Sequence, residues 1–441
     1  MRDIGAPCVS SRLERSPQEP GAAGGRMTTT PRVLRVLAAA AAVGLGLRLL
    51  FALGYWTNQP LTRDEHEYLS IARSLVHGNG FVYDESLPGG AATGVGRAPG
   101  YPLFLAFTGG GTSVVEAVPT SVKVAQAAVG IVGVLLLAAV AGRLAGPTAA
   151  AIAALLGAVH PPLVWVASYV WSEALAWPLG LASVWLFDRL AATQENEART
   201  GMAAGLVTGL TILVRPGTLL FVPAAAAWLA WRRRTRAIAW LLAGCVLVIA
   251  PWTMRNYARE GRLILVASEG GVTFWTGNHP LAAGDGDLST SPALKAALAE
   301  LQGRYPARTG AELEPVYYRE ALRWMREHPW AWLELEVRKA FFLVVPVGPS
   351  YAQHSIRYAA LSIGSYLVLL PLAAAGFVRL GSARARAPGL WLLGGSAVLL
   401  ALIFFPQERF RIPVIDPLLI VCASVAIAAR WSTSARADEC A

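Results

Sequence analysis

Long apolar runs alternate with short, arginine-rich polar segments along most of the chain. A helix needs about 20 apolar residues to cross a bilayer, because each residue adds about 1.5 Å of length. Suitable runs occupy residues 33–55, 118–141, 147–167, 173–191, 201–214, 217–231, 237–254, 357–379, 388–405 and 412–430. This pattern predicts an all-α polytopic membrane protein, a bundle of about 10 transmembrane helices (roughly 9–12).

Two of these runs, 201–214 and 217–231, are short and are separated by Arg215-Pro216-Gly217. A proline and an arginine at this point disfavour one continuous membrane helix. The two runs are therefore either two tilted helices or a single broken hairpin.

The arginines predict how the chain is oriented, because cytoplasmic loops of membrane proteins are enriched in basic residues. If the N-terminus lies inside, every inner loop carries arginine: Arg26, Arg32 and Arg35; Arg143; Arg189 and Arg199; Arg232, Arg233, Arg234 and Arg236; Arg379, Arg384 and Arg386; Arg430 and Arg436. We therefore expect a multi-pass protein of the bacterial plasma membrane with both termini in the cytoplasm. Its active site would lie on the outer face.

The same map divides the chain into five parts. Residues 1–32 are polar and are expected to form a disordered cytoplasmic N-terminus, with Met27 as an alternative start. A transmembrane module follows at 33–254, with a first outer loop at 56–117. Residues 255–356 form an extracytoplasmic loop region with amphipathic helices around 312–328 and 330–345. C-terminal transmembrane helices at 357–430 and a cytoplasmic tail at 431–441 complete the chain.

Composition supports a membrane protein and excludes several other classes. The chain is 55% hydrophobic and only 15% charged, whereas soluble domains average about 25% charged residues. The net charge of +10 comes from loop arginines and is explained by membrane orientation, so we expect no nucleic-acid partner. The four cysteines include no CxxC pair, which argues against both a disulfide framework and a zinc site.

The acidic pair Asp64-Glu65 is the main candidate for chemistry, because it directly follows the first apolar run. Thr62 and Glu65 have the spacing of a helix capping box, so one interpretation is simply a helix start. That interpretation accounts for Glu65 better than for Asp64. Asp64 and Tyr68 share one helical face, and an exposed carboxylate beside a substrate cleft could act as a general base.

Two further segments could contribute to the same cleft. Arg97-Ala98-Pro99-Gly100-Tyr101-Pro102 forms a rigid turn that is either a span entrance or a cleft wall carrying Arg97 and Tyr101. Glu173 opens an apolar run, where an acid either favours the helix N-terminus or serves a function. Asp64 and Glu173 together could position an acceptor or bind a divalent cation, although two carboxylates alone are a weak metal signal.

Four arginines, Arg215, Arg255, Arg409 and Arg411, are predicted near the outer face. Guanidinium groups offer paired donors that suit phosphate oxygens, although each could instead contact lipid headgroups. Arg409 and Arg411 precede Pro413 in the last outer loop and are the preferred phosphate ligands, with Arg255 as a third.

In their order along the chain, these motifs resemble the GT-C membrane glycosyltransferases. The resemblance runs from about residue 33 to 430 and is greatest to the bacterial family 39 group, which includes relatives of protein mannosyltransferases and aminoarabinose transferases. The matching stretches are 64–68, 97–102, Trp171-Ser172-Glu173, Arg215-Pro216, 251–257, Gly277-Asn278 and 409–413. The resemblance implies a catalytic Asp64, a second acid at Glu65 and a further acidic residue at Glu173. It also implies polyprenyl-phosphate sugar donors and inversion at the anomeric carbon. Some members use a divalent metal and others do not, so the cofactor stays open.

The sequence therefore predicts a membrane glycosyltransferase that moves a hexosyl or pentosyl group from a polyprenyl-phosphate donor. The acceptor would be a hydroxyl of a lipid, a glycan or a protein in the cell envelope. Two alternatives stay open: a lipid or solute transporter or flippase, and a non-catalytic assembly subunit. Transporters often carry midplane charges and inverted repeats, whereas the charges here gather at span ends and no repeat is found.

Overall fold

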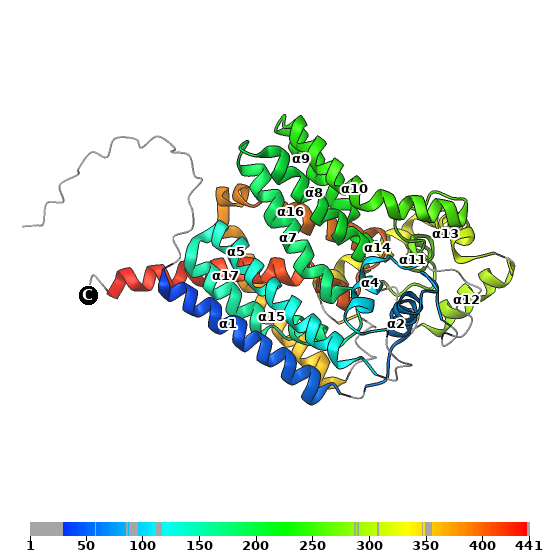
Figure 1. Cartoon of the computed structure of the whole chain (residues 1–441), viewed down its shortest axis with the longest axis horizontal. Helices are drawn as coiled ribbons and strands as arrows, with labels where there is room; N and C mark the ends of the chain where they lie inside the picture. Colours follow the sequence, from blue (N-terminus) through cyan, green and yellow to red (C-terminus); the bar gives the residue numbers. More distant parts are fainter. Residues whose placement is uncertain are drawn as a thin grey trace, which may run out of the picture.

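The computed structural model describes residues 30–57, 59–84, 87, 96–111, 117–285, 288, 291–306, 308–345, 347–348 and 355–438. These residues form helices and no strands, which confirms the predicted all-α fold class. Long helices lie side by side in a bundle, and α2, α11, α12 and α13 gather at one end of it (Figure 1). The bundle helices are α1 (Pro31–Leu50), α5 (Thr120–Val159), α7 (Glu173–Ala192), α8 (Glu197–Val214), α9 (Phe221–Trp231), α10 (Thr235–Glu260), α15 (Ile356–Leu380), α16 (Pro388–Ile403) and α17 (Ile415–Asp438).

Shorter helices connect and cover the bundle. After the first long helix, the chain forms η1 (Phe51–Tyr55), α2 (Arg63–Val76) and α4 (Gly100–Phe107). Between long helices lie α6 (Pro161–Trp165), η2 (Val166–Ser168), η3 (Pro216–Leu220), η5 (Gly381–Arg386) and η6 (Glu408–Arg411). The described residues between 261 and 345, here called the loop region, form α11 (Gly270–Gly277), α12 (Pro292–Gly303), α13 (Gly310–Glu327) and α14 (Pro329–Val344).

The predicted spans coincide with the bundle helices. Among the described residues, four helical segments are long and apolar enough to cross a membrane: Pro31–Tyr55, Thr120–Val159, Thr235–Glu260 and Ile356–Arg386. Pro216–Trp231 and Pro388–Ile403 are shorter apolar helices. The runs predicted at 118–141 and 147–167 share α5, which is broken where Gly146 adopts a φ of 83°. The chain is thus a multi-pass membrane protein.

Helix packing depends on small residues that let backbones approach closely. A side chain at Gly205 of α8 would place its Cβ 2.2 Å from the Leu241 carbonyl oxygen of α10. A Cβ at Gly133 of α5 would lie 2.2 Å from the Trp177 ring of α7. Small residues at such contacts are typical of membrane helix interfaces, where van der Waals packing holds helices together.

Two buried cations fix the end of the first long helix where the chain leaves the bundle. Lys123 donates to the carbonyls of Ala52, Trp56 and Thr57, and is 3% exposed. Arg48 donates to the carbonyls of Gly157 and Ala158 at the end of α5. Carbonyls at helix ends have no partner within the helix, so a buried cation there satisfies them and is itself stabilised.

The loop region contains the two amphipathic helices that the sequence predicts around 312–328 and 330–345, as α13 and α14. The segment 1–32, predicted to be disordered, lies outside the described residues up to residue 29, and Pro31 and Arg32 begin α1. In the predicted tail 431–441, α17 continues to Asp438, and residues 439–441 lie outside the described part.

Candidate active site

The α2 helix begins with the capping box that the sequence predicts. The Glu65 carboxylate accepts hydrogen bonds from the backbone amide and hydroxyl of Thr62, at 2.8 and 2.9 Å. Its other oxygen accepts a hydrogen bond from the Val170 amide at 2.9 Å. Glu65 is 2% exposed, and its hydrogen bonds connect α2 to the segment before α7. The neighbouring Asp64 remains at the surface of the helix.

The carboxylate of Asp64 lies between two arginines that come from distant parts of the chain. Its Oδ1 is 2.6 Å from Nη2 of Arg97, and its Oδ2 is 2.6 Å from Nη2 of Arg409. Burial would raise the pKa of Asp64, but the two guanidinium groups outweigh burial and hold this pKa well below its usual range. Asp64 is therefore ionised, and it is a weak base while both arginines are in place.

Arg97 also forms ion pairs with two acidic residues that were not among the predicted site residues. Its guanidinium lies 2.5 Å from Glu67 and 3.1 Å from Glu269, and it stacks over the Tyr68 ring at 4.9 Å. Glu269 comes from the loop region. Burial raises the pKa of Glu269, and repulsion from Glu67 and Asp64 adds to this effect against the attraction of Arg97.

Glu173 and Arg409 meet on the other side of Asp64. Nε of Arg409 is 3.9 Å from the Glu173 carboxylate, which also pairs with Nη1 of Arg215 at 3.0 Å. The Arg409 guanidinium lies over the rings of Trp171 and Phe410, at 5.4 Å from each centroid. Asp64, Glu173, Arg215 and Arg409 therefore share one cluster, although four separate segments carry them.

Arg411 does not accompany Arg409. It is 5% exposed, its guanidinium lies 4.3 Å from the Tyr366 ring centroid in α15, and it is close enough to affect the charges of Glu408 and Asp416. Alternate residues of the short η6 helix point to different sides, so the expected pair of phosphate ligands is split. Of these two arginines, Arg409 is the one that contacts Asp64 in the described structure.

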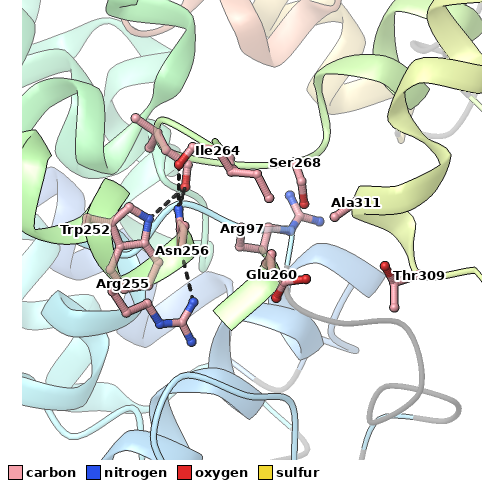
Figure 2. A pocket seen from close by; sticks show the side chains of 11 residues that line it. Arg97, Trp252, Arg255, Asn256, Glu260, Ile264, Ser268, Thr309 and Ala311 are labelled. Atoms are coloured by element: carbon pink, nitrogen blue, oxygen red, sulfur yellow. Dashed lines mark hydrogen bonds between the residues drawn. The ribbon is translucent and has the colours of Figure 1, made fainter. Parts of the chain in front are cut away.

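Arg255 lies in a recess that adjoins the cluster through Arg97 (Figure 2). It donates to the Phe81 carbonyl and to Asn256, and stacks on the rings of Phe81 and Trp252. No contact joins Arg255 to Asp64 or Arg409 among the described residues. The recess is lined by Arg97, Trp252, Arg255, Asn256, Glu260, Ile264, Val266, Ala267, Ser268, Thr309 and Ala311.

Tyr101 supports the cluster from behind. It is fully buried, its hydroxyl donates to Gln126 at 2.6 Å, and its ring packs edge-on against Tyr68 at 5.0 Å. Gln126 in turn donates to the Ala167 and Tyr169 carbonyls. The expectation that Tyr101 itself lines the cleft is therefore replaced by a supporting position. Tyr68 carries the Arg97 guanidinium on its face.

The carboxylates do not fit a divalent metal site. Both oxygens of Asp64 face arginine nitrogens, and those of Glu173 face Arg215 and the Ser172 hydroxyl. Within the described part of the chain, no group of three His, Cys, Asp or Glu side chains is placed to hold a metal ion.

Comparison with known proteins agrees with the resemblance seen in the sequence. A family described as dolichyl-phosphate-mannose-protein mannosyltransferase matches residues 97–254, a stretch that includes Arg97, Glu173 and Arg215. No curated protein matches the sequence. The archaeal oligosaccharyltransferase AglB from Archaeoglobus fulgidus, in complex with an inhibitory peptide and a dolichol-phosphate, is similar in structure with a TM-score of 0.57 and 15% identity. The chain has the GT-C glycosyltransferase fold.

The match to AglB covers 93% of this chain and 52% of that chain, so this chain spans about half the length of AglB. The Archaeoglobus fulgidus oligosaccharyltransferase tethered with an acceptor peptide has a TM-score of 0.59 and 14% identity, over 91% of this chain and 50% of that one. ArnT from Cupriavidus metallidurans bound to undecaprenyl phosphate gives a TM-score of 0.41 and 14% identity, over 90% and 76% of the two chains. The matched family and the Archaeoglobus fulgidus structures are glycosyltransferases, the class of enzyme that the sequence predicts for this chain.

Two members of the cluster were missed for different reasons. Glu67 is three residues after Asp64, and this helical spacing could have identified it as a neighbour. Glu269 had no comparable signal, because it follows an irregular segment, and only the fold brings that segment to Arg97.

Proposed function

We propose that this protein transfers a sugar from a polyprenyl-phosphate donor to a hydroxyl acceptor at the outer face of the bacterial plasma membrane, with inversion. The observation that carries the proposal is the position of Asp64 between Arg97 and Arg409, with Glu173 beside Arg409. The matched family is named for dolichyl-phosphate-mannose, and the AglB structure contains a dolichol-phosphate. Both names support a lipid-phosphate donor.

Arg409 is the proposed ligand of the donor phosphate. Its side chain is 25% exposed, and a planar guanidinium can donate two parallel hydrogen bonds to phosphate oxygens. Glu173 and the rings of Trp171 and Phe410 restrict the directions in which Arg409 can point. The lipid tail would remain in the bilayer while the phosphate reaches the end of the bundle.

Donor binding would also activate the base. A phosphate that takes hydrogen bonds from Arg409 competes with the Oδ2 atom of Asp64 for the same guanidinium. Asp64 then keeps only Arg97 as its cationic partner, so its pKa rises toward the ordinary value. The Asp64 carboxylate becomes a stronger base only when the donor is present, which disfavours removal of the acceptor proton before the donor is bound.

The proposed reaction is a single displacement. Asp64 takes the proton of the acceptor hydroxyl as its oxygen forms a bond to the anomeric carbon. The bond between this carbon and the donor phosphate oxygen breaks, and the phosphate leaves with the electron pair. Since the acceptor attacks the face opposite the phosphate, the configuration inverts. Arg409 stabilises the leaving phosphate, so no general acid is needed.

The other predicted acids act through Asp64 or Arg409. Glu65 is proposed as a positioning residue, because its carboxylate bonds to Thr62 and Val170 and faces no open cleft. Glu173 is proposed to position Arg409, because its carboxylate lies near the guanidinium groups of both Arg409 and Arg215. Arg255 and Arg97 line the recess, to which Arg409 does not contribute, and this recess is the proposed site for the acceptor.

The test uses the purified full chain in proteoliposomes with a radiolabelled polyprenyl-phosphate sugar and a membrane extract as the source of acceptors. The proposal predicts label on an acceptor with the wild type and with Glu334→Gln, whose carboxylate is exposed on α14, and transfer at least about 100-fold slower with Asp64→Asn. Label that only crosses the bilayer would support a flippase. No movement of label would support an assembly subunit.

The predicted orientation has its own test. Lys295 is exposed in the loop region, so Lys295→Cys in a chain whose native cysteines are replaced by serine reports which side that region faces. Labelling of intact cells by a membrane-impermeant maleimide is expected. Protection until the membrane is permeabilised would contradict the outer position.

A further inference from the structure

The short helix α11 contacts two segments that carry arginines of the candidate site. We call them the Arg97 wall, which is the segment around Gly96 and Arg97, and the Arg409 wall, which runs from the end of α16 to Arg409. At its start, the Glu269 carboxylate lies 3.1 Å from Arg97, and the Ser268 amide donates to the Gly96 carbonyl at 3.0 Å. At its end, the Asn278 side chain donates to the carbonyl of Ile403, the last residue of α16, at 2.9 Å. One end of α11 thus meets the segment of Arg97, and the other meets the segment that leads to Arg409.

The contact between Asn278 and the end of α16 is buried, and hydrogen bonds from neighbouring side chains complete it. Lys339 of α14 is 0% exposed, and its ammonium donates to Asn278 Oδ1 and to the Leu402 carbonyl, at 3.0 Å each, and to Glu336 at 2.6 Å. The Trp332 indole donates to the same Asn278 oxygen at 3.3 Å. One amide and one ammonium thereby satisfy the last carbonyls of α16, which have no partner within their own helix.

The backbones of α11 and the α16 terminus are in direct contact. A side chain at Gly277 would place its Cβ 2.0 Å from the carbonyl oxygen of Phe404. Phe404 is five residues before Arg409, so a shift at this contact reaches the guanidinium through a short connection. The pair Gly277-Asn278, one of the motifs found in the sequence, therefore has a place in the structure that the proposed reaction alone does not explain.

The spacing that α11 imposes is fixed. Its 8 residues span about 12 Å at 1.5 Å each. On its other side, the Gly271 amide donates to the Glu314 carboxylate of α13 at 3.0 Å, and a Cβ at Gly271 would lie 2.8 Å from the Glu314 carbonyl oxygen. A helix held in this way cannot slide or tilt without breaking contacts at both ends.

We infer that α11 is a spacer that sets the separation between the Arg97 wall and the Arg409 wall, so that both arginines reach Asp64. Asn278, Lys339 and Glu269 are then positioning residues for sugar transfer, an inference that rests on the proposed function. The loop region would be a working part of the active site and not only a surface for the acceptor.

The first test compares Asn278→Ala and Lys339→Met with the exposed controls Asn79→Ala and Lys295→Met. A misplacement of about 1 Å can cost roughly 100-fold in rate. We expect kcat per folded molecule to fall about 10- to 100-fold in Asn278→Ala and Lys339→Met, with a change below about 3-fold in the donor KM. The controls are expected to keep wild-type values.

A structural readout separates positioning from general destabilisation. Spin labels at position 103, on α4 directly after Arg97, and at position 399, on α16, are both exposed and report the separation of the two walls by double electron–electron resonance. The wild type should give a narrow distance distribution, and Asn278→Ala a broader or shifted one. An unchanged distribution together with an unchanged kcat would overturn the spacer.

The opposite end of α11 supplies a second, milder test. Glu269→Gln keeps an oxygen that can accept a hydrogen bond from Arg97, whereas Glu269→Ala removes it. The spacer predicts that kcat is largely retained in the first variant and lost about 10-fold or more in the second. Equal activity of the two variants would contradict it. If Asp64→Asn retained full transfer, the proposed reaction would fail, but the spin-label distances would still decide the spacer.

Discussion

Replacing Arg409 tests the phosphate site most specifically. Arg409→Gln removes the charge and the paired donors, and Arg409→Lys keeps the charge but replaces the planar fork with a compact ammonium. Both changes remove the guanidinium that lies over Trp171 and Phe410 but keep the aliphatic stem of the side chain, so the fold of η6 should persist.

The size of the effect follows from the contacts. A hydrogen bond to a charged group contributes about 1.5–3 kcal/mol, and each 1.36 kcal/mol changes a constant about tenfold. Losing one such interaction with the donor phosphate should reduce kcat/KM for the donor by about 10- to 150-fold in Arg409→Gln. Arg409→Lys should lie between this variant and the wild type, because one point charge remains.

The variant should also change the pH dependence in the absence of donor. Arg409 is one of two cations that lower the pKa of Asp64, so its loss raises that pKa toward the ordinary value. A group with a depressed pKa stabilises the folded state above its unfolded pKa, and that contribution is lost as pH falls through the folded pKa. In Arg409→Gln this contribution should therefore be smaller, and its loss should be complete at a higher pH than in the wild type.

Steady-state transfer assays at several donor concentrations measure the first effect, and unfolding of the donor-free protein at several pH values measures the second. The matched control is Arg323→Gln, which removes an exposed arginine from α13. An Arg409→Gln variant with wild-type kcat/KM for the donor would refute the assignment of Arg409 as the phosphate ligand. A fall seen equally in the Arg323 control would refute its specificity.

Two further predictions concern other acids. Glu65→Gln should lower the free energy of unfolding by about 1–3 kcal/mol, because the amide cannot accept hydrogen bonds at both of its ends. Thermal unfolding in detergent measures this, and a stability equal to wild type would contradict the role of Glu65. For Glu408, burial raises the pKa from 4.5 to about 7, so the folded state binds the proton more tightly and stability should fall by about 3 kcal/mol as pH rises through this window. Glu408→Gln should abolish that slope in unfolding experiments between pH 4 and roughly pH 8, and a retained slope would assign it to another group.

The sequence predicted most of the bundle because hydropathy directly reflects burial in lipid. Each apolar run coincides with a helix or with one half of α5. Hydropathy predicted two runs, 118–141 and 147–167, and α5 is broken between them at Ala145 and Gly146, although hydropathy did not show which backbone angles make the break. It also gave no sign that Lys123 and Arg48 would be buried, because their partners are backbone carbonyls that every residue possesses.

The sequence predicted those residues of the candidate site that are charged and lie in a recognisable motif at the end of an apolar run. Asp64, Glu173 and Arg409 were placed on one side by counting spans, and the structure brings them together. The separation of Arg411 from Arg409 depends on the geometry of one short helical turn, which sequence spacing did not resolve. Glu269 joins the cluster only through tertiary packing of the loop region.

The central claim is that Asp64 accepts the proton of the acceptor, and the turnover of Asp64→Asn tests it most directly. General-base catalysis contributes roughly 10²–10⁴-fold. Single-turnover transfer from a labelled polyprenyl-phosphate sugar should therefore slow by at least 100-fold, while the variant inserts into the membrane and remains folded. Transfer at the wild-type rate by a folded Asp64→Asn protein would contradict the claim.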